Sequence, residues 1–525
     1  IYLSIYLSIY LMRSAVLSPP PPNFTCRAGQ HVPGPLMKDA LFTEAPSSSG
    51  LLGKGGARSD ASCAAFVVIN LAAAVDSADA SLLHSVFRAL EADLQLGPSA
   101  LSTLALLQSL SMAVAAPVWG VLAATWSSRS LLSTAVFGWA VSSVLNGCAT
   151  SLGAFAVLRA LNGAALAVIT PLSFAMIAGM VPPARRGMAF GLLTLSNSIG
   201  AIAGATFATS VAGQRYFGHA GWRLPFFVAA LLALLLVPLI RAFVPLGASG
   251  SRSMARGDGG GGGGSARRAW ASARVLMRDA SLNRTLRLIT LQGLFGAVPW
   301  QVFGFLTMYL QYSGLADTRA ALVASCCRAG TALGGLAGGL VSDRCHRYSP
   351  AHGRIWLAQA ADLARLPIVC LLFGPQWGAA AEGGLYAALL LLLGFLAPWV
   401  GVTNKAIIAD AVPTRTRASA IALSLALEGT VAAFVGAPAV AWLAEHVHGY
   451  EAPPPGQAIA DMATELRQHN ANALSAAMFS MTFWPWLICC GLYSLVHFSF
   501  AADSRLARQA DRDERAAGGA ALEAQ

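Results

Sequence analysis

Ionisable side chains lie inside several long apolar runs of this chain. An ionised group is costly in a bilayer unless it is paired or hydrated, so such positions are candidates for binding a solute or a proton. Burial also favours the neutral form of a carboxyl, which suits a group that exchanges protons. The ionisable candidates for substrate or proton binding are Asp76, Asp79, Arg159, Arg328, Lys405 and Glu428.

Two further charges in an apolar run favour a structural role. Asp362 and Arg365 lie three residues apart and share one helix face, which predicts an ion pair that locks helices together. Asp76 and Glu428 lie deep within their runs, and for these a proton or substrate role and a structural role both remain open.

The composition places these charges in a membrane. The chain has 525 residues, of which 56% are hydrophobic and 11% charged, whereas a soluble domain has about 25% charged residues. Apolar runs of about 20 residues recur along most of its length, which excludes a soluble, collagenous, coiled-coil or disordered protein. The net charge of +11 comes from basic residues between the runs, as the positive-inside rule requires, so we expect no nucleic-acid partner.

The apolar runs predict an all-α membrane protein with twelve transmembrane helices in two six-helix bundles. A long connection at 244–284, which contains the run Gly259 to Gly264, predicts a flexible cytoplasmic linker between bundles at 62–243 and 285–502. The predicted helices are 62–84, 99–125, 130–149, 152–180, 187–213, 222–243, 285–313, 318–341, 355–375, 383–411, 416–445 and 473–502.

The two ends of the chain lie outside the predicted transmembrane helices. Residues 1–61 predict a disordered leader, and the four-residue period of 1–11 favours a translated non-coding repeat. Residues 503–525 predict a charged tail. Lysine and arginine are concentrated in the alternate connections that include 244–284, which places both termini in the cytoplasm of an integral, multi-pass protein whose membrane the sequence does not identify.

Two similar motifs follow the second and eighth apolar runs. The first extends from Gly120 to Arg129, and the second extends from Gly339 through Asp343 and Arg344 to Arg347, in the connection before the next run. Both resemble the G-x-L-a-D-r-x-G-r-k motif of the major facilitator superfamily, at the two places where its six-helix halves repeat. The first copy departs from the motif because Ala124 replaces its aspartate. In that family the aspartate contacts a neighbouring helix end and steadies the outward-open state.

Further stretches resemble the spinster-like branch of that family and its plant and green-algal relatives. They are Arg159-Ala160-Leu161-Asn162-Gly163, Arg186-Gly187-Met188-Ala189-Phe190-Gly191 and the acidic cluster Asp76-Ser77-Ala78-Asp79, and the first adds Asn162 to the candidate binding residues. The resemblance implies two rocking bundles around a central cavity, with Asp76, Arg159, Arg328, Lys405 and Glu428 on the helices that line it. Trp300, Phe303, Phe305 and Trp399 either stack on a substrate or pack the core.

The sequence as a whole favours a secondary transporter of a small organic solute, amphipathic or lipid-like by resemblance and coupled to protons through Glu428 or Asp76. The alternative is a non-transporting relative that acts as a receptor or interaction protein. No nucleophile and base constellation, Walker A motif or His-Glu-x-x-His motif occurs, so we expect neither an enzyme nor a cofactor or metal. The family resemblance implies a monomer in the lipid bilayer.

Overall fold

The computed structural model describes residues 55–181, 186–216, 218–245, 283–374, 383–453 and 462–523. Eleven helices in these residues are long and apolar enough to cross a membrane, and a twelfth span is bent by 41°. The elements are α3 (Gly55–Ser85), α4 (Phe87–Leu94), α5 (Pro98–Thr125), α6 (Ser128–Cys148), α7 (Leu152–Leu166), α8 (Ile169–Met180), α9 (Arg186–Ala212), β1 (Arg215–Tyr216), β2 (His219–Ala220), α10 (Arg223–Phe243), α12 (Arg284–Val302), η3 (Phe303–Phe305), α13 (Leu306–Tyr312), α14 (Asp317–Tyr348), α15 (Gly353–Phe373), α16 (Gly383–Ala411), α17 (Thr414–Trp442), η4 (Leu443–Val447) and α18 (Thr464–Glu523).

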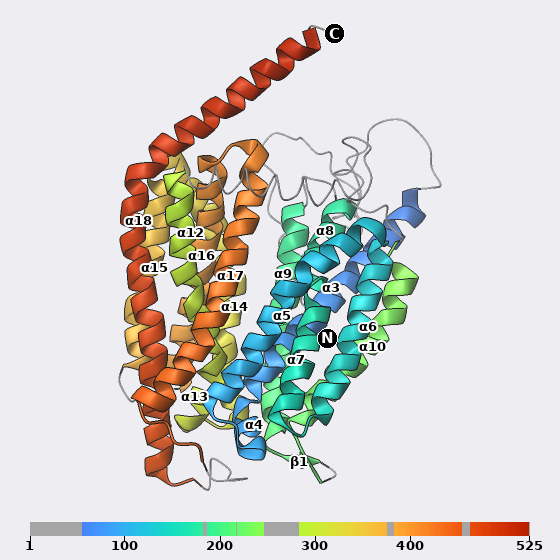
Figure 1. Cartoon of the computed structure of the whole chain (residues 1–525), viewed down its shortest axis with the longest axis vertical. Helices are drawn as coiled ribbons and strands as arrows, with labels where there is room; N and C mark the ends of the chain where they lie inside the picture. The colour runs from blue at the N-terminus through green and yellow to red at the C-terminus, as the bar shows by residue number, and fades with distance from the viewer. Residues whose placement is uncertain are drawn as a thin grey trace, which may run out of the picture.

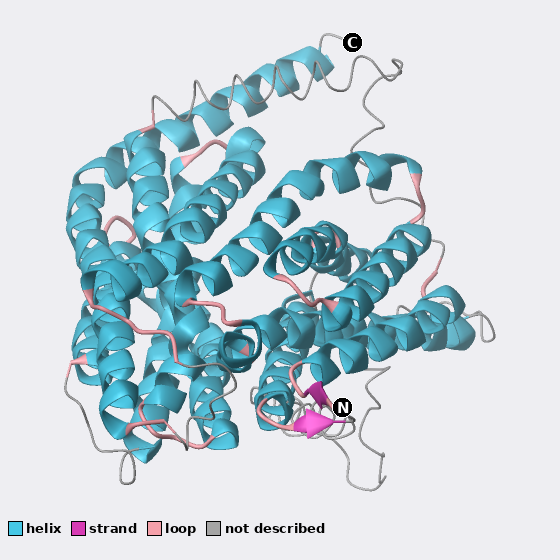
Figure 2. Ribbon diagram, turned by 60° about the horizontal axis from the view of Figure 1, so that its bottom comes forward, coloured by secondary structure: helices cyan, strands magenta, loops and turns pink. Residues whose placement is uncertain are grey.

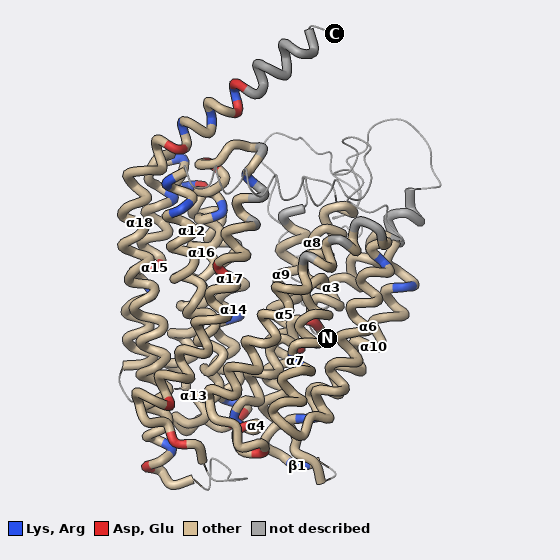
Figure 3. Tube along the Cα trace, in the orientation of Figure 1, with Lys and Arg blue, Asp and Glu red and all other residues tan. Residues whose placement is uncertain are grey.

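The helices form two groups that lie side by side (Figure 1). Helices α3 to α10 form the N-terminal bundle, and α12 to α18 form the C-terminal bundle. We call the end of the molecule at which α4 lies the α4 end, and the opposite end, from which α18 extends, the tail end. Charged residues gather toward these two ends, and few lie midway along the helices (Figure 3), as expected for helices that cross a bilayer.

Small elements complete the α4 end. Strands β1 and β2 pair antiparallel, with Arg215 opposite Ala220 and Tyr216 opposite His219. The connecting turn contains Gly218 at φ +82°, a backbone conformation that glycine adopts without strain. Figure 2 shows this strand pair at the margin of a helical structure.

The hydrophobic core is shared between the bundles at one end only. A buried cluster at the α4 end contains Leu83 and Phe87 of the N-terminal bundle together with Phe305 and Met308 of the C-terminal bundle. Toward the tail end each bundle has a core of its own, one around Trp139 and another whose members come from the C-terminal bundle alone. The bundles are therefore joined by apolar packing at the α4 end and are packed separately toward the tail end.

Glycines allow close packing within each bundle. A side chain at Gly200 or Gly204 of α9 would collide with the α3 backbone at Ala74 or Ala78. In the C-terminal bundle, Gly334 of α14 lies equally close to the backbone of α16. Small residues at such spacing permit close helix contact. The bend in α14 separates Asp317–Gly335 from Ala337–Tyr348, within this glycine-rich stretch.

Several predicted boundaries differ from the structure, and α14 ends at Tyr348 instead of 341. The predicted helix 152–180 is divided into α7 and α8, and 285–313 is interrupted by η3 shortly after Pro299. The last helix extends beyond the predicted 473–502 at both ends, because hydropathy does not detect the polar turns that continue a helix past its apolar part. Most of the predicted leader 1–61 and of the linker 244–284 lies outside the described residues.

Candidate functional site

A cavity of about 390 Å³ lies between the two bundles. Its wall is built by α3 and α9 on one side and by α12, η3, α13 and α14 on the other. Hydroxyl and amide groups line it from both bundles, including Ser81, Ser198, Gln301 and Thr307. A chamber with polar groups from both halves of a molecule can hold a solute that contacts both.

The cavity wall combines cationic and aromatic groups. Arg328 of α14 and His84 of α3 both line the cavity. The Arg328 side chain is exposed. Gly304 leaves the space that the His84 ring occupies. Trp300 and Phe303 also line the cavity, with ring centroids 5.7 Å apart. Such a wall can pair with an acidic group and cover an apolar one.

The two other aromatic candidates pack against protein. Phe305 is fully buried, and its ring centroid lies 5.2 Å from that of Phe87. Trp399 packs on Phe395, with centroids 5.5 Å apart, and lies against Gly338. These two rings therefore contribute to helix packing.

A chain of buried hydrogen bonds links two charged candidates in the N-terminal bundle. Arg159 of α7 donates to the side-chain oxygen of Gln108 in α5, and the Gln108 amide donates to Asn162 Oδ1 at 3.2 Å. Asn162 donates to Ser143 at 3.3 Å, and Ser143 donates to Asp79 Oδ1 at 3.2 Å. Arg159 and Asp79 are thus connected through neutral side chains.

Asp76 lies one helical turn before Asp79 and has a different partner. It accepts a hydrogen bond from the Thr170 hydroxyl of α8 at 3.3 Å, and 9% of the residue is exposed. The two carboxyls repel each other electrostatically. A carboxyl bonded to a neutral hydroxyl can gain or lose a proton without losing an ion-pair partner.

Glu428 and Lys405 occupy the C-terminal bundle. Glu428 of α17 is half-buried, and its carboxyl lies over Gly293 of α12, where a side chain would displace it. Lys405 of α16 is exposed and is the charge that attracts Glu428. Neither residue belongs to the wall of the 390 Å³ cavity, and the same is true of Asp76 and Arg159.

Asp362 and Arg365 form the ion pair that their spacing predicts. Arg365 Nη1 lies 2.7 Å from Asp362 Oδ1, and both residues are almost fully buried in α15. Arg365 Nη2 donates to the backbone oxygens of Leu396 and Ala397 in α16, at 2.6 and 3.0 Å. The pair therefore holds α15 against α16 just before Pro398.

The two motif copies make contacts within their own bundles. In the first copy, Gly120 lies in α5, and Arg129 donates to the backbone oxygen of Val244 at the end of α10. The second copy, from Gly339 to Arg347, lies inside α14, so its predicted place in a connection is wrong. Hydropathy marks the end of the apolar run and does not detect the polar turns with which α14 continues. There Asp343 lies 3.6 Å from Arg354, which also binds Asp410 of α16, while Arg344 and Arg347 are exposed.

The family follows from a comparison along most of the chain. The family model described as Major Facilitator Superfamily matches residues 69–437. This chain belongs to the major facilitator superfamily. It is therefore an integral, multi-pass membrane protein of a transporter family and not an enzyme, as the sequence predicts.

Solved members of the superfamily share the fold. A bacterial homologue of the human lysosomal transporter Spinster, in an inward-facing and unoccupied conformation, superposes with a TM-score of 0.69 and 17% identity, covering 86% of this chain and 99% of that one. A D-xylose–proton symporter superposes with a TM-score of 0.56 and 16% identity, covering 80% and 97%. The first of these likenesses agrees with the predicted resemblance to the spinster-like branch.

Curated relatives match over a shorter segment. The multidrug resistance protein MdtG of Salmonella paratyphi C (strain RKS4594) is 36% identical over 118 residues, which are 22% of this chain and 28% of that protein. The same-named protein of Escherichia fergusonii is 33% identical over 123 residues, 23% and 29% of the two chains. The chain thus spans under a third of the length of these relatives.

Several residues of these sites escape sequence reasoning. His84 lies at the end of a long apolar run, and Gln108 is an uncharged residue in another. Arg354 and Asp410 lie 56 residues apart in sequence, and only the packing of α15 on α16 brings them together. A polar residue inside an apolar run was the available signal for Gln108.

Proposed function

We propose that this chain is a secondary active transporter that moves a small organic solute across a membrane by alternating access, driven by protons. The cavity of about 390 Å³ between the bundles supports this proposal, because its wall joins Arg328 and His84 to hydroxyls and to the rings of Trp300 and Phe303. Such a wall suits an amphipathic or lipid-like solute. The acidic or polar end of such a solute pairs with Arg328, and the apolar part of the solute lies on the two rings.

Asp76 and Glu428 are the proposed proton sites. Asp76 is bonded to a neutral hydroxyl, and Glu428 lies between α12 and α17 with Lys405 as its attracting charge. Protonation removes a buried negative charge and thereby shifts the balance between two conformations of the bundles. One structural neighbour is a D-xylose–proton symporter, and this supports a proton-driven mechanism in this fold. In the proposed orientation the tail end faces the cytosol.

An untargeted comparison of lipids and metabolites tests the function. Cells expressing the chain are compared with cells expressing Arg328→Gln or Glu428→Gln at matched levels, and Glu465→Gln serves as the control because Glu465 is exposed at the α4 end. Relative to cells without the chain, we expect the amount of one compound class to change in cells expressing the chain or the control variant. We expect no such change in cells expressing Arg328→Gln. The Glu428→Gln variant should retain binding of that compound but lose its dependence on pH.

The alternative is a receptor or interaction protein without transport, and one feature favours it. Ala124 stands where the first motif copy has an aspartate in the family. If cells expressing the chain and cells expressing each variant all give the profile of cells without the chain, with every protein folded in the same membrane, transport is rejected and the search turns to protein partners.

A further inference from the structure

Side chains of both bundles meet around one buried carboxyl at the α4 end. Glu91 of α4 is 1% exposed and accepts hydrogen bonds from the hydroxyls of Tyr312, at 2.6 Å, and Tyr450. The Tyr450 hydroxyl lies 2.9 Å from the Tyr312 hydroxyl. Arg88 Nη1 lies 3.6 Å from Glu91, and its guanidinium lies over the Tyr312 ring at 5.4 Å. Glu91 and Arg88 belong to the N-terminal bundle and both tyrosines to the C-terminal bundle.

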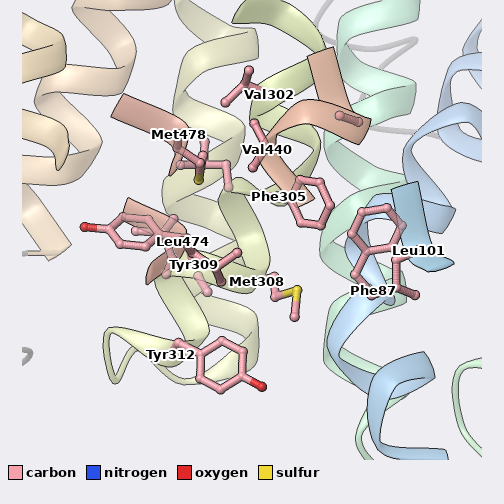
Figure 4. Packing of buried hydrophobic residues seen from close by; sticks show 14 of the residues in the cluster. Phe87, Leu101, Val302, Phe305, Met308, Tyr309, Tyr312, Val440, Leu474 and Met478 are labelled. Atoms are coloured by element: carbon pink, nitrogen blue, oxygen red, sulfur yellow. The ribbon is translucent and has the colours of Figure 1, made fainter. Parts of the chain in front are cut away.

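An apolar layer lies directly beside this polar cluster. Phe87 precedes Glu91 by one helical turn and therefore shares its face of α4. The Phe87 ring meets that of Phe305, with centroids 5.2 Å apart, and both residues are almost fully buried. Figure 4 shows Phe87 and Leu101 from one bundle facing Phe305 and Met308 from the other. The two bundles thus meet in a layer of rings and in a layer of hydrogen bonds.

The ring layer borders the cavity, because the Phe87 ring packs on that of His84 in the cavity wall, with centroids 5.2 Å apart. The cavity wall reaches Ser85, two residues before Phe87, and Thr307, two residues after Phe305. A further contact between the bundles lies at the same end, where the backbone N–H of Ser99 donates to Glu445 at 2.8 Å and its hydroxyl also donates to that carboxyl. A solute in the cavity therefore lies beside the ring layer, and the contacts between the bundles at the α4 end close that side.

We propose that Glu91, Tyr312 and Tyr450, with the Phe87–Phe305 layer, form the gate that closes the α4 end. Opening this end separates the carboxyl of one bundle from the hydroxyls of the other, and water then replaces these bonds. Since a protein hydrogen bond is exchanged for bonds to water at a small net cost, such a gate closes firmly and still opens. The gate rests on the alternating access of the proposed function, but it is measurable without knowledge of the solute.

Thiol accessibility tests the gate. Ser198 is half-buried and lines the cavity, so Ser198→Cys in the full chain reports whether a membrane-impermeant methanethiosulfonate reagent reaches the cavity. The reagent is applied to the α4 side in sealed vesicles, and the chain that keeps Ser198 supplies the background of the native cysteines. Tyr312→Phe removes a hydroxyl that crosses between the bundles and keeps the ring. We expect the modification rate to rise about tenfold, the effect of losing one hydrogen bond to a charged group.

Tyr309→Phe is the matched control. Tyr309 is also buried in α13, but its hydroxyl bonds to Leu372 and Tyr386 within the C-terminal bundle. We expect this variant to leave the rate unchanged, and Glu91→Leu, which accepts from neither hydroxyl, to raise it as Tyr312→Phe does. The gate is rejected if Tyr312→Phe and Glu91→Leu, both folded, match the control. Faster modification without any solute flux would keep the gate and reject transport.

A covalent lock gives an independent measurement. Ser99→Cys with Glu445→Cys places one thiol on each bundle at the α4 end, where the native side chains are hydrogen bonded to each other. In the background that carries Tyr312→Phe and Ser198→Cys, we expect the oxidised pair to abolish modification of the cavity thiol from the α4 side, and reduction to restore it. Unchanged modification after complete oxidation would show that the cavity is reached by another route and would overturn the proposal.

Discussion

The two bundles bury their charges in different ways. In the N-terminal bundle, Asp79 and Arg159 are joined through neutral side chains, so that each charge is stabilised without direct contact with the other. In the C-terminal bundle, Asp362 and Arg365 are in direct contact at 2.7 Å. A direct buried pair is stable only while both charges remain. A chain of neutral groups leaves no opposite charge in direct contact with the group that changes its protonation state.

This difference suggests that the two bundles have different roles. The Asp362–Arg365 pair bonds to α16 immediately before Pro398, where the proline interrupts the helical hydrogen bonds. It therefore acts as a fixed element of the C-terminal bundle. The hydrogen-bond chain of the N-terminal bundle ends at Asp79, one turn from the proposed proton site Asp76, and reaches α5 and α7. We interpret this chain as the part that responds to protonation.

The largest expected effect comes from breaking the direct pair. Asp362→Leu leaves Arg365 as an uncompensated buried charge, which costs about 3–5 kcal/mol of unfolding free energy. We expect a loss of folded protein in gel filtration from detergent. Adding Arg365→Met should restore folded protein, because the unpaired charge is removed. Equal yields of the single variant and the unmodified chain would mean that the pair does not stabilise the bundle.

A smaller effect is expected at the neutral chain. Gln108→Leu removes the group between Arg159 and Asn162, and we expect a loss of about 1–3 kcal/mol, the cost of leaving a buried polar group unpaired, while Asn162 keeps its bonds to serine hydroxyls. Chemical unfolding in detergent measures this loss. Gln359→Leu is the control, because Gln359 is a half-buried glutamine of α15 that bonds to α18 within the C-terminal bundle. If Gln108→Leu costs as much as Asp362→Leu, the two bundles do not differ as we describe.

The sequence predicts the apolar and locally paired features better than the remote ones. Apolar runs define the helices, and the three-residue spacing of Asp362 and Arg365 predicts their ion pair. Glu91 could not be recognised in this way, because Tyr312 and Tyr450 lie 221 and 359 residues away. A short polar helix such as α4 also has no apolar run to mark it. The role of α4 depends on its contact with the other bundle, and a hydropathy pattern does not report contacts between distant segments.

The gate should respond to pH with a definite sign. Burial raises the pKa of Glu91 above its ordinary 4.5, while Arg88 and the bonds from Tyr312 and Tyr450 lower it and Glu445 raises it. Opening returns the carboxyl to water and to its ordinary pKa, so closing takes up a proton. The closed gate is therefore favoured as the pH on the α4 side falls from the raised pKa toward 4.5, and opening is favoured above this range.

Modification of the Ser198→Cys thiol from the α4 side measures this dependence, after correction for the thiolate fraction with a small thiol. Burial raises the pKa of Tyr450 well above its ordinary value, and Glu91 adds to this, so that Tyr450 remains a donor throughout. We expect slower modification at low pH in the unmodified gate and a flat profile in Glu91→Gln. An identical pH profile in both proteins would assign the response to another group.

The smallest expected effect concerns the way in which the bundles cap their helices. In the N-terminal bundle, Ser127 and Ser151 accept hydrogen bonds from the backbone of their own helices, at 3.2 and 3.4 Å. In the C-terminal bundle, Asn283 caps α12 locally, and α18 supplies further caps from a distance. Asp503 accepts from the backbone N–H of Thr285 in α12, and Asp511 from that of Thr414 in α17, both at 2.8 Å. A carboxylate at a helix N-terminus also interacts favourably with the helix dipole.

Asp511→Asn tests this remote cap, because the amide keeps an acceptor but loses the charge. We expect a loss of about 0.5–1 kcal/mol in unfolding free energy, measured by chemical unfolding in detergent. Asp513→Asn is the matched control, since Asp513 is exposed two residues further along the same helix. A loss in Asp511→Asn alone, which high salt reduces, would mean that the tail stabilises α17 electrostatically. Equal stability of the two variants would mean that the bond from Asp511 does not stabilise α17, and the contrast in capping between the bundles would fail.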